Sequence, residues 1–173
     1  MKTSLAKNTR AGNQTSVKND STFVKCALTD NPRAEVIEAD LEDGSDPFSG
    51  DGPLAGRRFA GVLVSNYLYR PHNAALIDAL EPGGVLIYET FARGNEAYNR
   101  PRNPDHLLQS GELLDLVRGR LQVVAYEHGI VDKNPCPGVI QRICAVNDLG
   151  NDLGGGGRED GEPAPHSVVP KED

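Results

Sequence analysis

The chain has 173 residues, a formal net charge of −7, and ordinary charged and apolar fractions of 25% and 38%, so it is long enough and apolar enough for one domain with a hydrophobic core. The acidic balance disfavours a nucleic-acid partner, which usually requires a basic face. No run of about 18 apolar residues is present, so the sequence predicts no membrane-spanning helix.

Both ends of the chain lack the pattern of a folded domain. Residues 1–33 are polar and have no periodic apolar residues, and their basic start lacks the apolar segment of a secretory signal. We predict a disordered arm over residues 1–33. Residues 148–173 are rich in Gly, Pro and acids, which predicts a disordered tail. The folded domain is expected between them, at residues 34–147.

The cysteines indicate a reduced protein. There are three of them, Cys26, Cys136 and Cys144, and no two form a C-x-x-C pair. An odd number of widely spaced cysteines suits a cytoplasmic protein better than a disulfide-bonded one. No two histidines have the spacing of ligands on a helix or a hairpin, so we expect no metal site.

Two strands open the predicted domain. The segment AEVIEAD, residues 34–40, ends on an acid and precedes a loop of turn residues. The run FAGVLVSN, residues 59–66, is apolar and rich in β-branched residues. This pattern is typical of a strand that is covered on both faces.

A helix and a third strand follow. Asn73 is placed to cap the helix AALIDAL, in which Leu76, Ile77 and Leu80 share one face. The Pro-Gly-Gly turn that begins at Pro82 then reverses the chain, because glycine tolerates positive φ. The buried strand GVLIYETF comes next.

The last elements are a helix and two strands. Ser110 is placed to cap the helix GELLDLVRG, and Gly119 to end it. The short linker DKNPCP between LQVVAYEHGIV and GVIQRICAV indicates an antiparallel hairpin. The whole order predicts an α/β protein with a mostly parallel sheet and a C-terminal antiparallel β-hairpin. Glu89 and Thr90 then lie at the carboxyl edge, where open α/β sheets bind ligands.

These segments resemble the second half of a class I S-adenosylmethionine-dependent methyltransferase. VIEADLED is similar to the third strand of that family, FAGVLVSNYLYRP to the fourth strand with its loop, ALEPGGVLIYETF to the turn into the fifth strand, and the final hairpin to the strands that close the sheet. NYLYRP and YETFARGNE resemble small bacterial methyltransferases of the tellurite-resistance-like type. The resemblance implies a partial Rossmann-like methyltransferase sheet over residues 34–147, S-adenosylmethionine as the cofactor and a small molecule as the methyl acceptor.

The resemblance also assigns residues to the cofactor. It implies that Asp40 accepts a hydrogen bond from the adenine amino group, that Leu41 packs on the adenine ring, and that Asn66 and Tyr67 face the methyl group. Asn66 would contact the cofactor, and both residues would orient the acceptor during methyl transfer. The structural alternatives are a loop acid that caps a turn at Asp40 and an ordinary surface loop at Asn66 and Tyr67.

Substrate-binding residues are expected after the fourth and fifth strands of the resemblance. We assign this role to Tyr69, Glu89 and Arg93, with an ion pair between Glu89 and Arg93 as the structural alternative. The polar loop FARGNEAYNRPRNPDHLL is long enough to form a lid. Its cations Arg93, Arg100 and Arg102 would attract an anionic acceptor, although the loop also carries acids.

One part of the family pattern is missing. The family binds its cofactor with a first strand that ends in an E/D-x-G-x-G turn and a second strand that ends in an acid, and the residues before the first predicted strand hold neither. The chain therefore resembles a truncated methyltransferase, and a non-catalytic remnant or interaction module is the alternative function. A third strand without its usual neighbours would leave an unpaired sheet edge that favours self-association. A nicotinamide-dependent oxidoreductase also needs a glycine-rich first turn, and a hydrolase would need a G-x-S-x-G motif.

Overall fold

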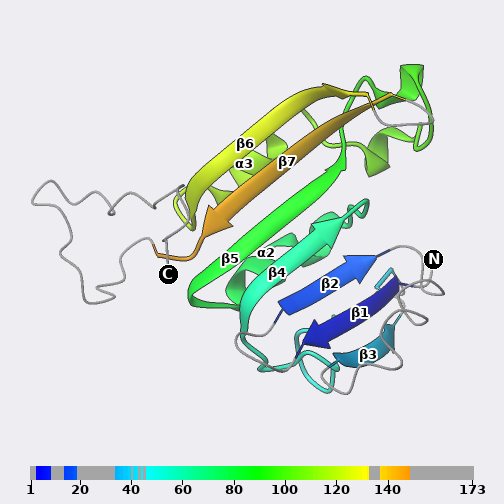
Figure 1. Ribbon diagram of the computed structural model, residues 1–173. Coiled ribbons are helices and arrows are strands. Elements are labelled where there is room, and N and C mark those ends of the chain that lie inside the picture. Colours follow the sequence, from blue (N-terminus) through cyan, green and yellow to red (C-terminus); the bar gives the residue numbers. More distant parts are fainter. Residues whose placement is uncertain are drawn as a thin grey trace, which may run out of the picture.

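The strands form one seven-stranded sheet in the order β3-β1-β2-β4-β5-β7-β6 (Figure 1). The computed structural model describes residues 3–8, 14–18, 34–39, 41–42, 44, 46–132 and 137–148. The strands are β1 (Thr3–Asn8), β2 (Gln14–Lys18), β3 (Ala34–Ala39), β4 (Phe59–Ser65), β5 (Leu80–Phe91), β6 (Gln122–Val131) and β7 (Gly138–Val146).

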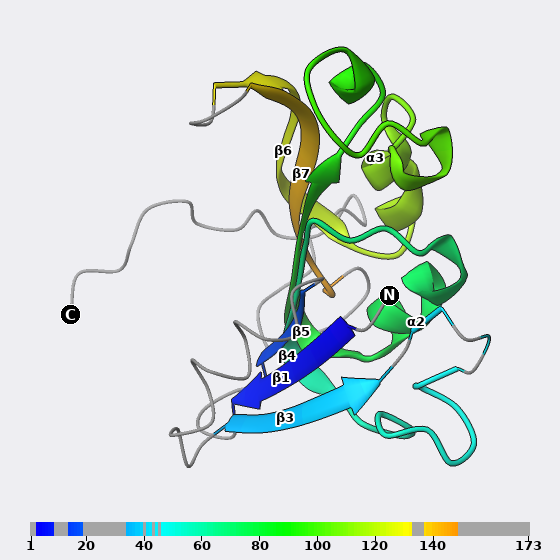
Figure 2. The same ribbon diagram turned by 90° about the vertical axis from the view of Figure 1, so that its right-hand side faces the viewer.

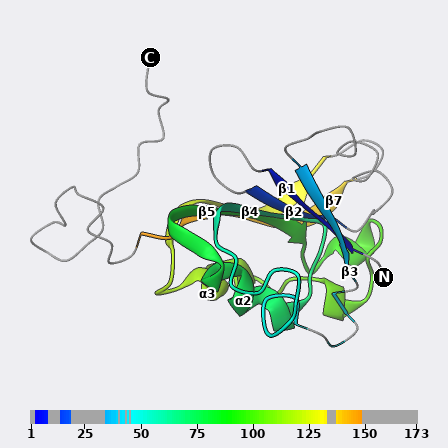
Figure 3. The ribbon, with the colours of Figure 1, turned by 90° about the horizontal axis from the view of Figure 1, so that it is seen from below.

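The described helices all cover the same face of the sheet (Figures 2 and 3). They are short, and three of them are 3-10 helices. They are η1 (Arg70–His72), α2 (Asn73–Asp78), η2 (Asn95–Ala97), η3 (Pro104–His106) and α3 (Glu112–Val117). None of the helices in the described part of the chain is long and apolar enough to cross a membrane.

The sheet is mixed. β2 pairs with β4 and β4 pairs with β5 in parallel, whereas the other four pairings are antiparallel. The α/β class and the antiparallel hairpin of β6 and β7 are confirmed. The expectation of a mostly parallel sheet holds only at the centre, because β1 and β2 also form an antiparallel pair.

Strands β1 and β2 differ from the prediction for residues 1–33. We expected a disordered arm, but β1 pairs with both β2 and β3. The segments TSLAKN and QTSVK contain β-branched Thr or Val, which suit an extended backbone, and their pairing gives β3 a neighbour. The rest of that range and the tail after Asp148 lie outside the described residues, and the limits of arm, domain and tail stay predictions.

Helix α2 ends earlier than its apolar pattern predicts. Leu80 was expected on the helix face with Leu76 and Ile77, but α2 ends at Asp78 and Leu80 begins β5 opposite Phe59. Pro82 disfavours a helical conformation at the residue before it, so the chain extends there. The register of β4 against β5 shifts just after this pair, and the Pro-Gly-Gly segment therefore lies inside the first half of a strand.

The core lies between the sheet and its helices. Tyr88 and Leu86 of β5 are each 1% exposed, and Leu113 and Val117 of α3 are fully buried against them in one apolar cluster. Gly119 has a φ of 66°, as expected of a residue that ends a helix. Ser110 does not cap α3, whose N-terminal cap is Gly111 with no side-chain hydrogen bond.

Candidate functional site

A cleft lies at the carboxyl ends of the parallel strands β4 and β5. Its volume is about 810 Å³, which is within the range of small-molecule sites. It combines apolar, aromatic, acidic and basic side chains. The lining residues are Glu42, Asn66, Tyr67, Leu68, Thr90, Phe91, Arg100, Pro101, Arg102, Asn103 and His106.

Asn66 and Tyr67 lie together in this cleft, directly after β4. Asn66 has a φ of 54°, in the left-handed region that asparagine tolerates better than most residues. Its backbone N–H donates to the carbonyl of Glu89 at 2.9 Å, which fixes the end of β4 against β5. Tyr67 is 5% exposed and contributes to the cleft wall. The structure therefore brings together the two residues that were assigned to methyl transfer, and their roles stay predictions.

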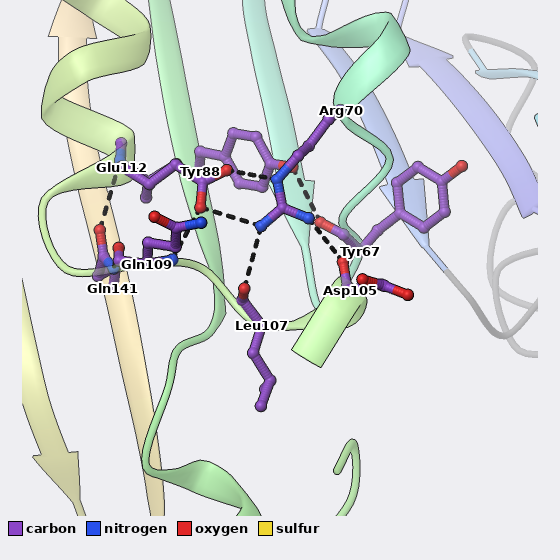
Figure 4. A network of polar contacts seen from close by, with 9 residues as sticks. Tyr67, Arg70, Tyr88, Asp105, Leu107, Gln109, Glu112 and Gln141 are labelled. Atoms are coloured by element: carbon purple, nitrogen blue, oxygen red, sulfur yellow. Dashed lines mark hydrogen bonds and ion pairs between the residues drawn. The ribbon is translucent and has the colours of Figure 1, made fainter. Parts of the chain in front are cut away.

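A hydrogen bond from Tyr88 holds this turn in place. Its hydroxyl donates to the backbone carbonyl of Tyr67 at 3.0 Å (Figure 4). Burial, assisted by the nearby Tyr67 and Glu112, raises the pKa of the Tyr88 hydroxyl, which stays protonated and can donate this bond across the neutral range.

Arg70 and Glu112 join the two segments that border the cleft. Arg70 Nε lies 2.6 Å from Glu112 Oε1, and Arg70 Nη2 lies 3.0 Å from Oε2 (Figure 4). The same guanidinium donates to the carbonyl of Asp105 at 2.7 Å and to that of Leu107 at 3.0 Å. One side chain thus positions η3 relative to η1 and α3.

A buried glutamine extends this network. Gln141 is fully buried on β7, and its Oε1 accepts hydrogen bonds from the N–H of Leu113 at 3.3 Å and from the hydroxyl of Tyr126 at 3.1 Å. Its Nε2 donates to the carbonyl of Gln109 (Figure 4). The amide therefore attaches the start of α3 to the last described strand.

The turn after β3 contributes Glu42 to the cleft, while Leu41 points into the core. Leu41 is 4% exposed, and its carbonyl lies 2.9 Å from Nε2 of His72. Asp40 lies outside the described residues. The assigned contacts of Asp40 and Leu41 with adenine stay predictions, and Glu42 is the described residue of this turn that lines the cleft.

The three residues assigned to the substrate are not among those that line the cleft. Tyr69 packs on the ring of His72, with a centroid distance of 4.8 Å. Glu89 lies 3.5 Å from Arg142 of β7, so its described ion pair differs from the pair with Arg93 that was the structural alternative to substrate binding. Burial raises the pKa of Glu112 and the hydrogen bonds from Arg70 and Gln109 lower it, while the charge of the exposed Arg93 is the smallest of the influences that lower it.

The loop after β5 supplies most of the residues that the site assignment omitted. The cleft is lined by Arg100, Pro101, Arg102, Asn103 and His106 of this loop, together with Thr90 and Phe91 at the end of β5. The length and polarity of the loop predicted a lid, and its arginines were recognised as attractive to an anion. The sequence held no signal for which arginines face the cleft, because that depends on the turns at η2 and η3.

A metal site is not found in the part of the chain that the structure describes, where no three His, Cys, Asp or Glu side chains form a group able to hold an ion. The titratable side chains of the cleft are instead distributed between its two sides. Glu42 follows β3, whereas Arg100, Arg102 and His106 follow β5.

Comparisons with known proteins give distant similarities of the backbone only. No protein-family model matches the chain, and no curated protein does. TehB from Haemophilus influenzae has a TM-score of 0.44 at 9% identity, over 54% of this chain and 37% of that one. The N-methyltransferase NodS from Bradyrhizobium japonicum has a TM-score of 0.43 at 14% identity, over 60% and 57%.

A third solved structure has the same degree of similarity. It is a SAM-dependent methyltransferase from Methanosarcina mazei, with a TM-score of 0.43 at 14% identity, over 61% of this chain and 66% of that one. The matched part of this chain thus spans between about a third and two thirds of the length of these proteins.

Proposed function

We propose that the chain transfers a methyl group from S-adenosylmethionine to a small molecule in the cleft. The observation that carries the proposal is the position of the cleft at the carboxyl ends of two adjacent parallel strands, in a sheet closed by an antiparallel hairpin. The quoted motifs that resemble class I methyltransferases supply the strands and turns that border it. Localisation in the cytoplasm is part of the same proposal.

The residues of the cleft fit the cofactor in kind. The carboxylate of Glu42 can accept hydrogen bonds from ribose hydroxyls. When bound, S-adenosylmethionine supplies an activated methyl group. Asn66 and Tyr67 would orient the acceptor, because direct displacement depends chiefly on alignment and on the exclusion of water.

The alternative function is a non-catalytic interaction module. It is favoured by the missing E/D-x-G-x-G turn, since lost contacts to a polar cofactor weaken its binding. The chain would then self-associate through a sheet edge. β3 and β6 are the two edge strands of the described sheet, with one neighbour each, and we take β6 as the candidate edge because its Ile130 is 63% exposed.

Calorimetric titration with S-adenosylmethionine and its demethylated product tests the proposal. We expect wild type to bind with micromolar affinity. We expect Asn66→Gly, which keeps the backbone conformation, to bind at least tenfold more weakly. A folded wild-type chain that binds neither compound at millimolar concentration would overturn methyl transfer. Light scattering of wild type and Ile130→Lys then tests the alternative, which requires a dimer or larger species that the substitution dissociates.

A further inference from the structure

Two arginines in the cleft have no side-chain partner among the described residues, and only Arg93, which does not line the cleft, shares this property with them. The side chains of Arg57, Arg58, Arg70, Arg118, Arg120 and Arg142 each form an ion pair or a hydrogen bond. Those of Arg100 and Arg102 form neither with any described residue, and both line the cleft. An arginine left without a protein partner in a cleft remains available to a ligand.

The acidic side chains of the same loop are engaged elsewhere. Glu96 Oε2 accepts a hydrogen bond from the N–H of Gly94 at 2.8 Å. The hydrogen bond to Glu112 is the main cause that raises the pKa of Arg70. The charge of Asp105 raises it further, so the carboxylate of Asp105 interacts with Arg70. Glu42, which follows β3, is the one carboxylate in the lining. The loop side of the cleft therefore has a positive potential.

The segment that carries both arginines is held on each side. Asn95 is fully buried, and its Nδ2 donates to the carbonyls of Asn99 at 3.3 Å and Pro101 at 3.2 Å, on either side of Arg100. Its Oδ1 accepts from the N–H of Val139 in β7 at 3.2 Å. Beyond Arg102, the hydrogen bonds of Arg70 to the carbonyls of η3 and Leu107 hold the chain. A fixed backbone lowers the entropy that ligand binding would cost.

We propose that Arg100 and Arg102 bind the carboxylate or phosphate group of an organic acid, whose apolar body packs on Leu68 and Phe91. The planar guanidinium matches either anion with two parallel hydrogen bonds, which a neutral ligand of the same shape cannot form. The methyl acceptor is then an organic anion. That last statement rests on the proposed function, whereas anion binding does not.

Matched probes test the inference on the full chain. The probes are 2-naphthoate, 1-naphthyl phosphate and the neutral 2-naphthalenemethanol, with affinities from fluorescence titration. The variant is Arg100→Gln with Arg102→Gln, which removes no described ion pair. The control is Arg118→Gln, which removes a cation paired with Asp115 on α3. Circular dichroism checks that both proteins are folded.

We expect one or both anions to bind wild type at least tenfold more tightly than the neutral probe, since a hydrogen bond between charged groups is worth a factor of about ten or more. The double variant should lose that advantage, and Arg118→Gln should keep it. Whichever anion loses more affinity identifies carboxylate or phosphate as the bound group. Equal binding of charged and neutral probes, no saturable binding, or an unchanged double variant would overturn the inference.

Titration of the same proteins with S-adenosylmethionine separates the two proposals. Charge-dependent naphthoate binding without cofactor binding would leave the anion site standing and remove methyl transfer. Cofactor binding without charge-dependent probe binding would support methyl transfer and overturn the anion site. If the double variant loses the cofactor but keeps the probes, the arginines bind the cofactor carboxylate and the inference is wrong.

Discussion

Arg70 and Glu112 are 42 residues apart in the chain and form a two-point ion pair beside the cleft. Because Arg70 also binds the carbonyls of Asp105 and Leu107, this one pair joins η1, η3 and α3. The cleft wall formed by the loop after β5 therefore depends on a side chain that follows β4.

Replacement of Arg70 by Lys should weaken this joint, because an ammonium cannot reproduce the four hydrogen bonds of the guanidinium. We expect a loss of about 1–2 kcal/mol in the free energy of unfolding, measured by urea denaturation. Arg118→Lys is the matched control, since Arg118 pairs only with Asp115 in the described structure and is largely exposed. Equal losses in the two variants would show that the Arg70 network adds no stability.

The Glu112 pair should make stability depend on pH. Burial raises the pKa of Glu112, but the hydrogen bonds from Arg70 and from the N–H of Gln109 outweigh it, so the folded pKa lies below its ordinary value. The folded state then binds this proton less readily than the unfolded state. The stabilisation of the folded state by ionised Glu112 is therefore fully present above the pKa of the unfolded chain, about pH 4.3. It is lost as the pH falls through the pKa of Glu112 in the folded state.

The comparison that isolates this carboxylate is wild type against Glu112→Gln, by urea denaturation between pH 7 and pH 3. Wild type should be more stable at pH 7, and the difference should shrink as the pH falls below about 4. A difference that stays constant over this range would contradict the role of the ionised carboxylate.

Tyr88→Phe should remove the hydrogen bond to the carbonyl of Tyr67 without leaving a cavity. The expected cost is about 1 kcal/mol of unfolding free energy, because a buried carbonyl loses its donor. Tyr98→Phe is the control, since Tyr98 is 41% exposed. In an alkaline absorbance titration, the Tyr88→Phe variant should lack one tyrosine whose ionisation is shifted to higher pH, because burial raises the pKa of Tyr88.

Substitutions at Asn66 should separate its backbone from its side chain. Asn66→Val should destabilise the chain by about 1–2 kcal/mol, because a β-branched residue is strained at a φ of 54°. Asn66→Gly adopts the same φ without that strain and should therefore be more stable than Asn66→Val. If Asn66→Val unfolds at the same urea concentration as wild type, the turn can relax to another conformation.

Gly84 should tolerate no side chain. A Cβ there would lie 2.8 Å from the carbonyl oxygen of Glu81 and 3.0 Å from that of Phe59, both backbone atoms. Gly84→Ala should therefore cost at least about 1 kcal/mol of stability in a thermal melt, since the backbone must move. Gly129→Ala in β6 meets no atom within 4 Å and serves as the control.

The sequence predicted those elements whose signals are local. The apolar run of β4, the hairpin of β6 and β7 and the left-handed glycine at Gly119 follow from short patterns and are found in the structure. Leu80 was misassigned because its spacing from Leu76 fits a helix, while the proline two residues later favours an extended chain.

The features that the sequence did not predict depend on contacts between distant segments of the chain. The pairing of β1 with β3 joins the strand predicted over residues 34–40 to a segment whose polar composition gave no indication of a sheet. The placement of Asn66 and Tyr67 in one cleft was anticipated because both directly follow a strand. The sequence did not predict that Arg100 and Arg102, rather than Arg93, line the cleft. That arrangement depends on Asn95, whose hydrogen-bond partners lie in the loop and in β7.

The position of β7 in the sheet has a consequence for synthesis on the ribosome. β7 lies between β5 and β6, yet it is the last of the described strands to emerge. Until it does, β5 and β6 have no strand between them, and the growing chain presents an open edge on β5 that the complete sheet covers. Completion of the sheet, and of the wall that Asn95 and Gln141 attach to β7, therefore waits for the final described segment, so nascent chains halted before Gly138 should be the form most in need of a chaperone.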